Sequence, residues 1–363
     1  MTQASTLSQD SATDTMLAAI FKGEGEVALE RRPIPHPESP DDIVIKVGAV
    51  GICGSDLHAL HTPPTHPGKP GVIFGHEFCG EIVEMGSAVS GLSIGQHVAV
   101  DQNPPCGRCM PCREGDGNFC ETLFDNPYLD YPWPNTPGFF WDGGMANYVR
   151  VPAYFAYPVD PSVPYELIVL GEPLGCVLNA LDKIGVRSND RAVVIGGGPM
   201  GLLSAAALKH RGAQQVIVIE PSAARAAIAL KLGADAVIDP KDGPVVDAVK
   251  AATGGRGASC IVEAVGSQLD SAIEMAADQA RIAVLGINSA NRASFPPMEV
   301  TVKELHIHGA FLMRYTMKAA LDLIQSRALP LEHVVSHVLP LDEVLTGLQL
   351  AQRGEGLKIV FKP

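Results

Sequence analysis

The chain has 363 residues, which at about 150 residues per domain predicts two domains that each bury a core. Hydrophobic residues make up 46% and charged residues 18%, with 37 Gly and 29 Pro, so the composition is globular and turn-rich and excludes disorder over most of the length. The 40 acidic and 27 basic residues give a formal net charge of −13, which would repel nucleic acid and anionic membranes, so neither is expected as a partner.

The first 16 residues are expected to form a flexible leader. They contain no Lys or Arg and no apolar run, so they lack both parts of a secretory signal. The most apolar later stretch, residues 192–208, is interrupted by glycines and is too short to span a bilayer comfortably. We therefore expect a cytoplasmic protein that does not enter a membrane.

Up to about residue 170, short β-branched runs such as residues 42–47 and 97–100 lie between turn residues. This pattern predicts antiparallel strands in a barrel-like domain. From about residue 191, apolar strands alternate with Ala/Leu-rich helices, as in a parallel sheet. We predict six strands in a doubly wound order, at residues 191–195, 215–220, 236–239, 259–264, 281–286 and 305–310. A helix at 318–325 and a closing strand at 357–361 follow.

Four of the eight cysteines lie close together, with the spacing Cys106-x2-Cys109-x2-Cys112-x7-Cys120. In a reducing compartment such a cluster is more often a metal site than a set of disulfides. Four thiolates surround a tetrahedral ion and leave no coordination position open, which predicts a structural zinc lobe at about residues 101–121. Iron–sulfur ligation is the alternative, because cysteine spacing alone does not exclude it.

A glycine-rich loop follows the predicted strand 191–195 and opens the predicted helix 201–210. The run Gly196-Gly197-Gly198-Pro199-Met200-Gly201 fits G-x-G-x-x-G. Gly196 permits a tight turn, Gly198 lets the backbone approach a pyrophosphate, and Gly201 lets helix and strand pack closely. A glycine-rich turn without a ligand is the alternative, which the strand-turn-helix context disfavours.

Glu220 ends the next predicted strand, 19 residues after Gly201. A carboxylate there would accept both ribose hydroxyls and repel a 2′-phosphate, which favours NAD over NADP. Arg225, five residues further on, is the residue that would instead meet a 2′-phosphate.

A second set of metal-binding side chains is dispersed, with Cys53 after Gly51, His76 and Glu77 after Gly75, and Glu172 before Pro173. Each alone has an ordinary interpretation, as a core residue or, for Glu172, as a helix cap. Together with the four-cysteine cluster and the glycine loop, these strings resemble the zinc-dependent medium-chain dehydrogenases, over nearly the whole chain after about residue 17.

The resemblance implies an α/β protein with a GroES-like, β-rich catalytic domain and an inserted Rossmann domain with a doubly wound parallel sheet. We place the first at residues 17–173 and 311–363 and the second at residues 174–310. Cys53 and His76 carry over as ligands of a catalytic zinc. Glu172 stands where other alcohol dehydrogenases of the family have a cysteine, so the chain is similar to the sorbitol, threonine and butanediol dehydrogenase branch. A homotetramer or homodimer is implied as well.

The third zinc ligand is expected to be Glu77. The Cys53 thiolate and the Glu77 carboxylate already neutralise Zn²⁺, so a second direct carboxylate would leave the site at −1 and make a bound alcohol less acidic. We therefore expect Glu172 to act through water or in exchange with Glu77. Cys176 is an alternative ligand, although a small buried residue is the simpler interpretation.

The expected chemistry is oxidation of a secondary alcohol, a polyol or a bulky or cyclic one, with hydride transfer to NAD. We expect two zinc ions per chain, of which the catalytic one lowers the pKa of the bound hydroxyl. Ser55 would take the proton and His58 would pass it to solvent, a relay that the resemblance extends through the cofactor ribose. For His58, a solvated loop histidine is the alternative.

Residues 124–141 hold seven of the 20 aromatic residues and both tryptophans. In the proteins that this chain resembles, the segment runs beside the substrate cleft, where aromatic rings exclude water and stack on a substrate. We expect at least one of Tyr131, Trp133 and Phe140 to line the pocket. Burial in the core or in a subunit contact is the alternative.

Three rival functions remain to be compared with this one. An L-threonine or butanediol dehydrogenase would belong to the same branch. A zinc-free quinone or enoyl reductase would lack the set formed by Cys53, His76 and Glu77. A non-catalytic NAD-binding or structural relative would keep the fold without the activity, and an NAD⁺ reduction assay with several alcohols would reveal it.

Overall fold

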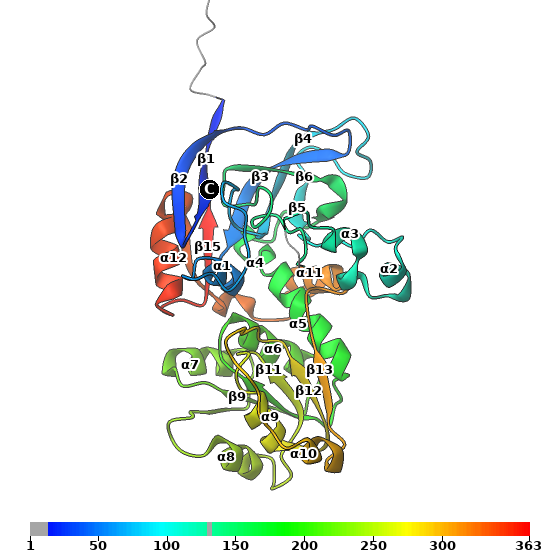
Figure 1. Ribbon diagram of the computed structural model, residues 1–363, viewed down its shortest axis with the longest axis vertical. Helices are drawn as coiled ribbons and strands as arrows, with labels where there is room; N and C mark the ends of the chain where they lie inside the picture. Colours follow the sequence, from blue (N-terminus) through cyan, green and yellow to red (C-terminus); the bar gives the residue numbers. More distant parts are fainter. Residues whose placement is uncertain (1–13, 129–132) are drawn as a thin grey trace, which may run out of the picture.

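The computed structural model describes residues 14–128 and 133–363. Figure 1 shows two units, a β-rich one that holds both the first and the last strands and one built on the middle of the chain. Among the described residues no helix is long and apolar enough to cross a membrane.

The β-rich unit contains an antiparallel hairpin, β1-β2, and a larger sheet in the order β14-β15-β3-β4-β5-β7, with β6 paired to β3. β1 begins at Thr15, so the last two residues of the predicted leader are in a strand, and residues 1–13 lie outside the described part of the chain. The strands are β1 (Thr15–Gly23), β2 (Glu26–Pro33), β3 (Asp42–Gly51), β4 (Glu77–Met85), β5 (His97–Val100), β6 (Tyr148–Pro152), β7 (Ala156–Pro158), β14 (Val335–Pro340) and β15 (Lys358–Lys362).

The second unit is a six-stranded parallel sheet in the order β10-β9-β8-β11-β12-β13. This is the doubly wound order with a switch point between β8 and β11, and it confirms the predicted fold class. Its strands are β8 (Arg191–Ile195), β9 (Gln215–Ile219), β10 (Ala236–Ile238), β11 (Ala258–Glu263), β12 (Ala276–Val284) and β13 (His306–Gly309). The central strands are apolar on both faces because helices cover both sides.

Helix α5 (Gly171–Ile184) lies between the two sheets in Figure 1; the sequence suggested a helix capped by Glu172 but not its bounds or its place in the fold. The predicted domain boundary at 173/174 falls inside it, and the boundaries stay a prediction. The other helices are α1 (Gly54–Ala59), α2 (Met110–Glu114), α3 (Glu121–Phe124), α4 (Tyr165–Ile168), α6 (Pro199–His210), α7 (Ala223–Lys231), α8 (Val245–Ala252), α9 (Leu269–Met275), α10 (Pro297–Val302), α11 (Met317–Gln325) and α12 (Val344–Gln352).

One apolar cluster joins the two units. It includes Ala49 and Cys79 from the β-rich sheet, Leu174 and Leu181 from α5, and Val194 from the parallel sheet, all almost completely buried. Helix α5 is therefore held on both sides by the same core.

Candidate active site

Three metal-binding side chains meet where two central strands of the β-rich sheet, β3 and β4, end and begin. One ligand atom each from Cys53, His76 and Glu77 lies within 4.8 Å of the others. Glu77 is the first residue of β4 and pairs with Gly51 at the end of β3, so the sheet register brings it close to Cys53, which precedes α1. Gly75 has φ of +86°, and a Cβ there would lie 2.6 Å from the side chain of Met145, so this turn requires glycine.

His76 is oriented by a residue that the sequence analysis did not identify. Its Nδ1 lies 3.2 Å from Oδ1 of Asp56, which is fully buried and also accepts a 2.9 Å hydrogen bond from the backbone N–H of Cys53. Burial would lower the pKa of His76, but Asp56, with help from Cys53, raises it well above its usual value. A proton on Nδ1 facing Asp56 leaves Nε2 as the nitrogen that faces a metal ion.

Glu77 has a buried cationic partner. The Nζ of Lys358, in β15, lies 2.8 and 2.6 Å from the two oxygens of Glu77 and donates to the carbonyl of Ile52 at 3.0 Å. Burial would lower the pKa of Lys358, but Glu77 and Cys53 raise it, so the ammonium is charged. Glu77 was expected to bind zinc in preference to Glu172 because two carboxylates and the Cys53 thiolate would leave the site at −1. Lys358 adds a positive charge that this sum did not include. With Lys358 included, two carboxylates, one thiolate and Zn²⁺ would sum to zero.

Glu172 stands in the first turn of α5 and lies outside the group of three. Its Oε1 accepts hydrogen bonds from the side chains of Gln102 and, at 3.5 Å, Cys176. Burial, followed by Glu172, raises the pKa of the Cys176 thiol well above its usual value. Cys176 is therefore a protonated partner of Glu172 in this arrangement, and it is not part of the group either.

Ser55 and His58, the two residues of the predicted proton relay, both lie on α1. Ser55 Oγ is 3.4 Å from Nε2 of His76, which places the hydroxyl at the candidate metal site. Burial, followed by His61, lowers the pKa of His58, so its imidazole is neutral and able to accept a proton at pH 7. No hydrogen bond joins Ser55 to His58 in the described part of the chain, and the relay stays a prediction.

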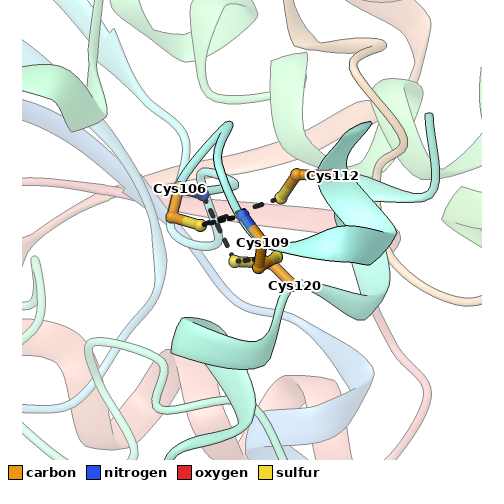
Figure 2. Close-up of side chains that lie close together, drawn as sticks. All are labelled: Cys106, Cys109, Cys112 and Cys120. Atoms are coloured by element: carbon orange, nitrogen blue, oxygen red, sulfur yellow. Dashed lines mark hydrogen bonds between the residues drawn. The ribbon is translucent and has the colours of Figure 1, made fainter. Parts of the chain in front are cut away.

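The four clustered cysteines form a second site, in which their side chains converge between a loop and α2 (Figure 2). Sγ of Cys106 lies 4.0 Å from that of Cys112, and Sγ of Cys109 lies 3.8 Å from that of Cys120. Zinc–sulfur bonds of about 2.3 Å in a tetrahedron separate sulfurs by about 3.8 Å, so the set fits one zinc ion. Backbone N–H groups of Arg108 and Cys109 lower the pKa of Cys106 to about 5, which favours the thiolate.

The glycine loop fits a dinucleotide. Gly196 has φ of +101°, and a Cβ on Gly201 would lie 1.8 Å from the carbonyl oxygen of Gly196. No heavy atom lies within 4 Å of a Cβ placed on Gly198, so the backbone there is open to a pyrophosphate. Pro199 and Met200 begin α6, which follows β8 as predicted. The N-terminus of this helix supplies positive potential to phosphates.

Glu220 lies directly after β9, at the carboxyl edge of the parallel sheet. Its two oxygens accept hydrogen bonds from the backbone N–H of Gly197 at 2.7 Å and of Ser222 at 2.8 Å. The carboxylate is thereby held against the glycine loop. Arg225 instead donates to the carbonyls of Gly354 and Gly356, just before β15, so the carboxyl edge of the sheet faces the β-rich unit.

The aromatic segment is divided between two places. Trp133 lies with its ring centroid 4.6 Å from that of His66, and Phe139 lies 5.0 Å from His76. Phe140 is buried in the core of the β-rich unit and stacks on Tyr128. Tyr131 lies outside the described residues. Phe139, which was not singled out from the sequence, packs against His76 of the candidate metal site and is buried in the same core as Phe140.

Asp56 and Lys358 are the main residues missed. Asp56 carried a local signal, because it follows Cys53 by three residues and caps the turn that holds it. Lys358 carried none, since 281 positions separate it from Glu77.

Comparison with known proteins agrees with this geometry. Residues 199–326 match a family model described as zinc-binding dehydrogenase, and residues 39–161 match the alcohol dehydrogenase GroES-like domain. The chain is 30% identical to probable D-xylulose reductase A of Aspergillus clavatus, over 98% of this chain and 99% of that protein. It is also 30% identical to L-threonine 3-dehydrogenase of Bacillus licheniformis, over 96% of this chain and 100% of that protein.

A solved structure from Sinorhizobium meliloti, described as a zinc-binding dehydrogenase bound to NADP, superposes with a TM-score of 0.88 and 30% identity, covering 96% of this chain and 99% of that one. The predicted family and fold are confirmed by these matches. The chain belongs to the zinc-dependent medium-chain dehydrogenase family, whose GroES-like and zinc-binding dehydrogenase models match residues 39–161 and 199–326.

Proposed function

We propose that this chain oxidises a secondary alcohol, with a polyol as the favoured class and a bulky or cyclic alcohol as the alternative, and transfers the hydride to NAD. The observation that carries the proposal is the convergence of a thiol, an imidazole and a carboxylate, from Cys53, His76 and Glu77, within 4.8 Å. This is a donor set that zinc prefers, and with three protein ligands it leaves a fourth position for substrate. Family membership makes the chain an oxidoreductase that uses zinc and a nicotinamide dinucleotide.

The residues around the donors have distinct tasks in this proposal. A zinc ion held by Cys53, His76 and Glu77 would supply Lewis acidity to a substrate hydroxyl. Asp56 fixes the ring orientation of His76 through Nδ1, and Lys358 holds the carboxylate of Glu77 in place. Ser55 Oγ is positioned to accept the hydroxyl proton, because it lies 3.4 Å from the metal-facing nitrogen of His76. His58, neutral at pH 7, would then carry that proton to solvent.

The substrate class follows from chemistry that relatives share. The two relatives described above are named for D-xylulose and for L-threonine, which are a ketone and a secondary alcohol. We carry over to this chain only the chemistry that the two relatives share, which is the interconversion of a secondary alcohol and its ketone. A threonine- or butanediol-type activity is the alternative within the branch.

NAD is the proposed cofactor, and NADP the alternative. Glu220 is held at the glycine loop by two backbone N–H groups, where its negative charge would repel a 2′-phosphate. Arg225 is occupied by the carbonyls of Gly354 and Gly356 and is not aimed at that phosphate. The proposal also includes two zinc ions per chain, a homotetramer or homodimer, and a cytoplasmic location.

The test measures reduction of NAD⁺ and NADP⁺ by zinc-replete protein with 2-butanol, 2,3-butanediol, a pentitol and L-threonine. We expect alcohol-dependent reduction of NAD⁺ that disappears in His76→Ala. Elemental analysis of the same sample should find close to two zinc ions per chain. Absence of activity with every alcohol and both cofactors would contradict the proposal and favour a non-catalytic relative.

A further inference from the structure

His66 lies among aromatic rings one residue layer away from the candidate metal site. Its ring centroid is 4.2 Å from that of Phe139 and 4.6 Å from that of Trp133, which it meets edge-on. The ring of Phe139 is in turn 5.0 Å from His76. His66 therefore belongs to the aromatic wall beside the metal donors, and its imidazole brings a ring-nitrogen acceptor that neither Phe139 nor the indole of Trp133 has.

The hydrogen bonding of His66 fixes which ring nitrogen is an acceptor. Nδ1 lies 2.7 Å from the carbonyl oxygen of Pro67, and since a carbonyl can only accept, Nδ1 is the donor. Burial lowers the pKa of His66 to about 4, against smaller opposing effects of Pro67 and Asp56, while His76 and His58 lower it further. The ring is thus neutral at pH 7, and its lone pair is on Nε2.

Nε2 of His66 has no hydrogen-bond partner among the described residues. Because this nitrogen is not fully buried, it is open to a ligand. An acceptor without a donor, beside the ring of Phe139 and edge-on to the ring of Trp133, suits a hydroxyl group attached to an apolar carbon chain. It would repel a carboxylate.

We propose that His66 is a specificity residue for polyols, whose Nε2 accepts a hydrogen bond from a second substrate hydroxyl while the first reacts at the metal site. This inference rests on the proposed function. His66 would favour a polyol over an amino acid, because an amino acid would bring its carboxylate toward the lone pair on Nε2. Trp133, which is only partly buried, would pack against the carbon skeleton of the substrate.

The experiment compares kcat/KM for 2,3-butanediol and 2-butanol, which differ by one hydroxyl, with zinc-replete protein and NAD⁺. His66→Phe keeps the aromatic ring and removes the acceptor, so the diol-to-monoalcohol ratio should fall about 10- to 100-fold with little change for 2-butanol. His66→Gln keeps an acceptor and should retain most of the ratio. His61→Phe is the matched control, because His61 also contacts a proline carbonyl through Nδ1 but is exposed.

An unchanged ratio in His66→Phe, or an equal loss with both alcohols, would overturn the inference. Nitrogen-15 NMR of the histidines in unmodified, zinc-replete protein tests it even where a variant fails to fold. We expect an Nδ1–H tautomer for His66 and a shift of Nε2 on adding 2,3-butanediol, whereas an Nε2–H tautomer refutes the inference. Failure of the proposed function would look different, as absence of activity with every alcohol in the unmodified protein.

Discussion

The buried ion pair between Lys358 and Glu77 allows a direct test of the metal site. Both side chains are almost completely buried, at 2% and 0% exposure, and Nζ contacts both carboxylate oxygens. Replacing one partner of a buried pair leaves an uncompensated charge and costs about 3–5 kcal/mol. We therefore expect Lys358→Met to lower the free energy of unfolding of metal-free protein by about that amount.

The same strand provides the control. Lys362 pairs with Glu166 at 3.0 Å, but the lysine side chain is 48% exposed, so Lys362→Met should cost about 1 kcal/mol or less. Urea denaturation followed by circular dichroism, with chelator and then with saturating zinc, measures both variants. If Glu77 binds zinc, the ion supplies the positive charge that Lys358 no longer provides. The difference in free energy of unfolding between the two variants should then shrink when zinc is added.

Two results would refute this reasoning. Equal costs for Lys358→Met and Lys362→Met in metal-free protein would mean that Lys358 does not compensate Glu77. A gap that zinc leaves unchanged would mean that Glu77 is not a ligand, and Glu172 would take its place. Because the pKa of Lys358 is raised, its contribution is complete below the unfolded value of about 10.4 and is lost only above it, so measurements near pH 7.5 are not affected by its titration.

Three further predictions concern the other sites. Cys112→Ser should lower zinc content by one ion and reduce stability, and a stable variant with full zinc content would contradict a structural site at the four cysteines. Glu220→Ala should weaken NAD binding by about 1.5–3 kcal/mol and reduce the preference over NADP, as measured by kcat/KM for both cofactors; equal use of NADP⁺ by the unmodified protein would reject the role of Glu220. Because the pKa of His66 is lowered to about 4, its neutral form contributes stability that is complete above the unfolded value of about 6.5 and is lost as the pH falls toward 4, by about 3 kcal/mol in total. His66→Gln should remove this part of the pH dependence of unfolding, and an identical pH profile in the variant would contradict the buried, neutral state of His66.

Spacing located the residues whose chemistry is local, whereas the dispersed set of Cys53, His76 and Glu77 was located through the resemblance to a family. Gly196, Gly198 and Gly201 belong to one turn, and the four cysteines lie within one lobe, so spacing alone carries the geometry. The strands of the parallel sheet were located within a few residues, apart from β12, which begins at Ala276, five residues before the predicted start. That earlier start is polar in part, which the apolar pattern does not reveal.

The residues that it missed act across the sheet. Lys358 meets Glu77 only because β15 pairs with β3 and β3 with β4, and this register has no counterpart in either local sequence. The extent and central position of α5 were not predicted, because burial on nearly all sides of the helix removes the one-sided apolar pattern by which an amphipathic helix is recognised. Missing Lys358 had a consequence for the metal site, because its positive charge changes the net charge of the zinc ion and its ligands.

The apolar cluster that runs through α5 has a consequence for engineering this protein. A chimera that exchanged the parallel-sheet unit with that of a relative at the 173/174 boundary would join the first three residues of α5 from one parent to the remaining eleven from the other. Leu174 and Leu181 would then face a foreign partner surface on one side, at fully buried positions where a mismatch of one methylene group costs about 1 kcal/mol. A junction in the turn between α5 and β8, or before α4, would transfer the helix intact and leave the cofactor unit exchangeable.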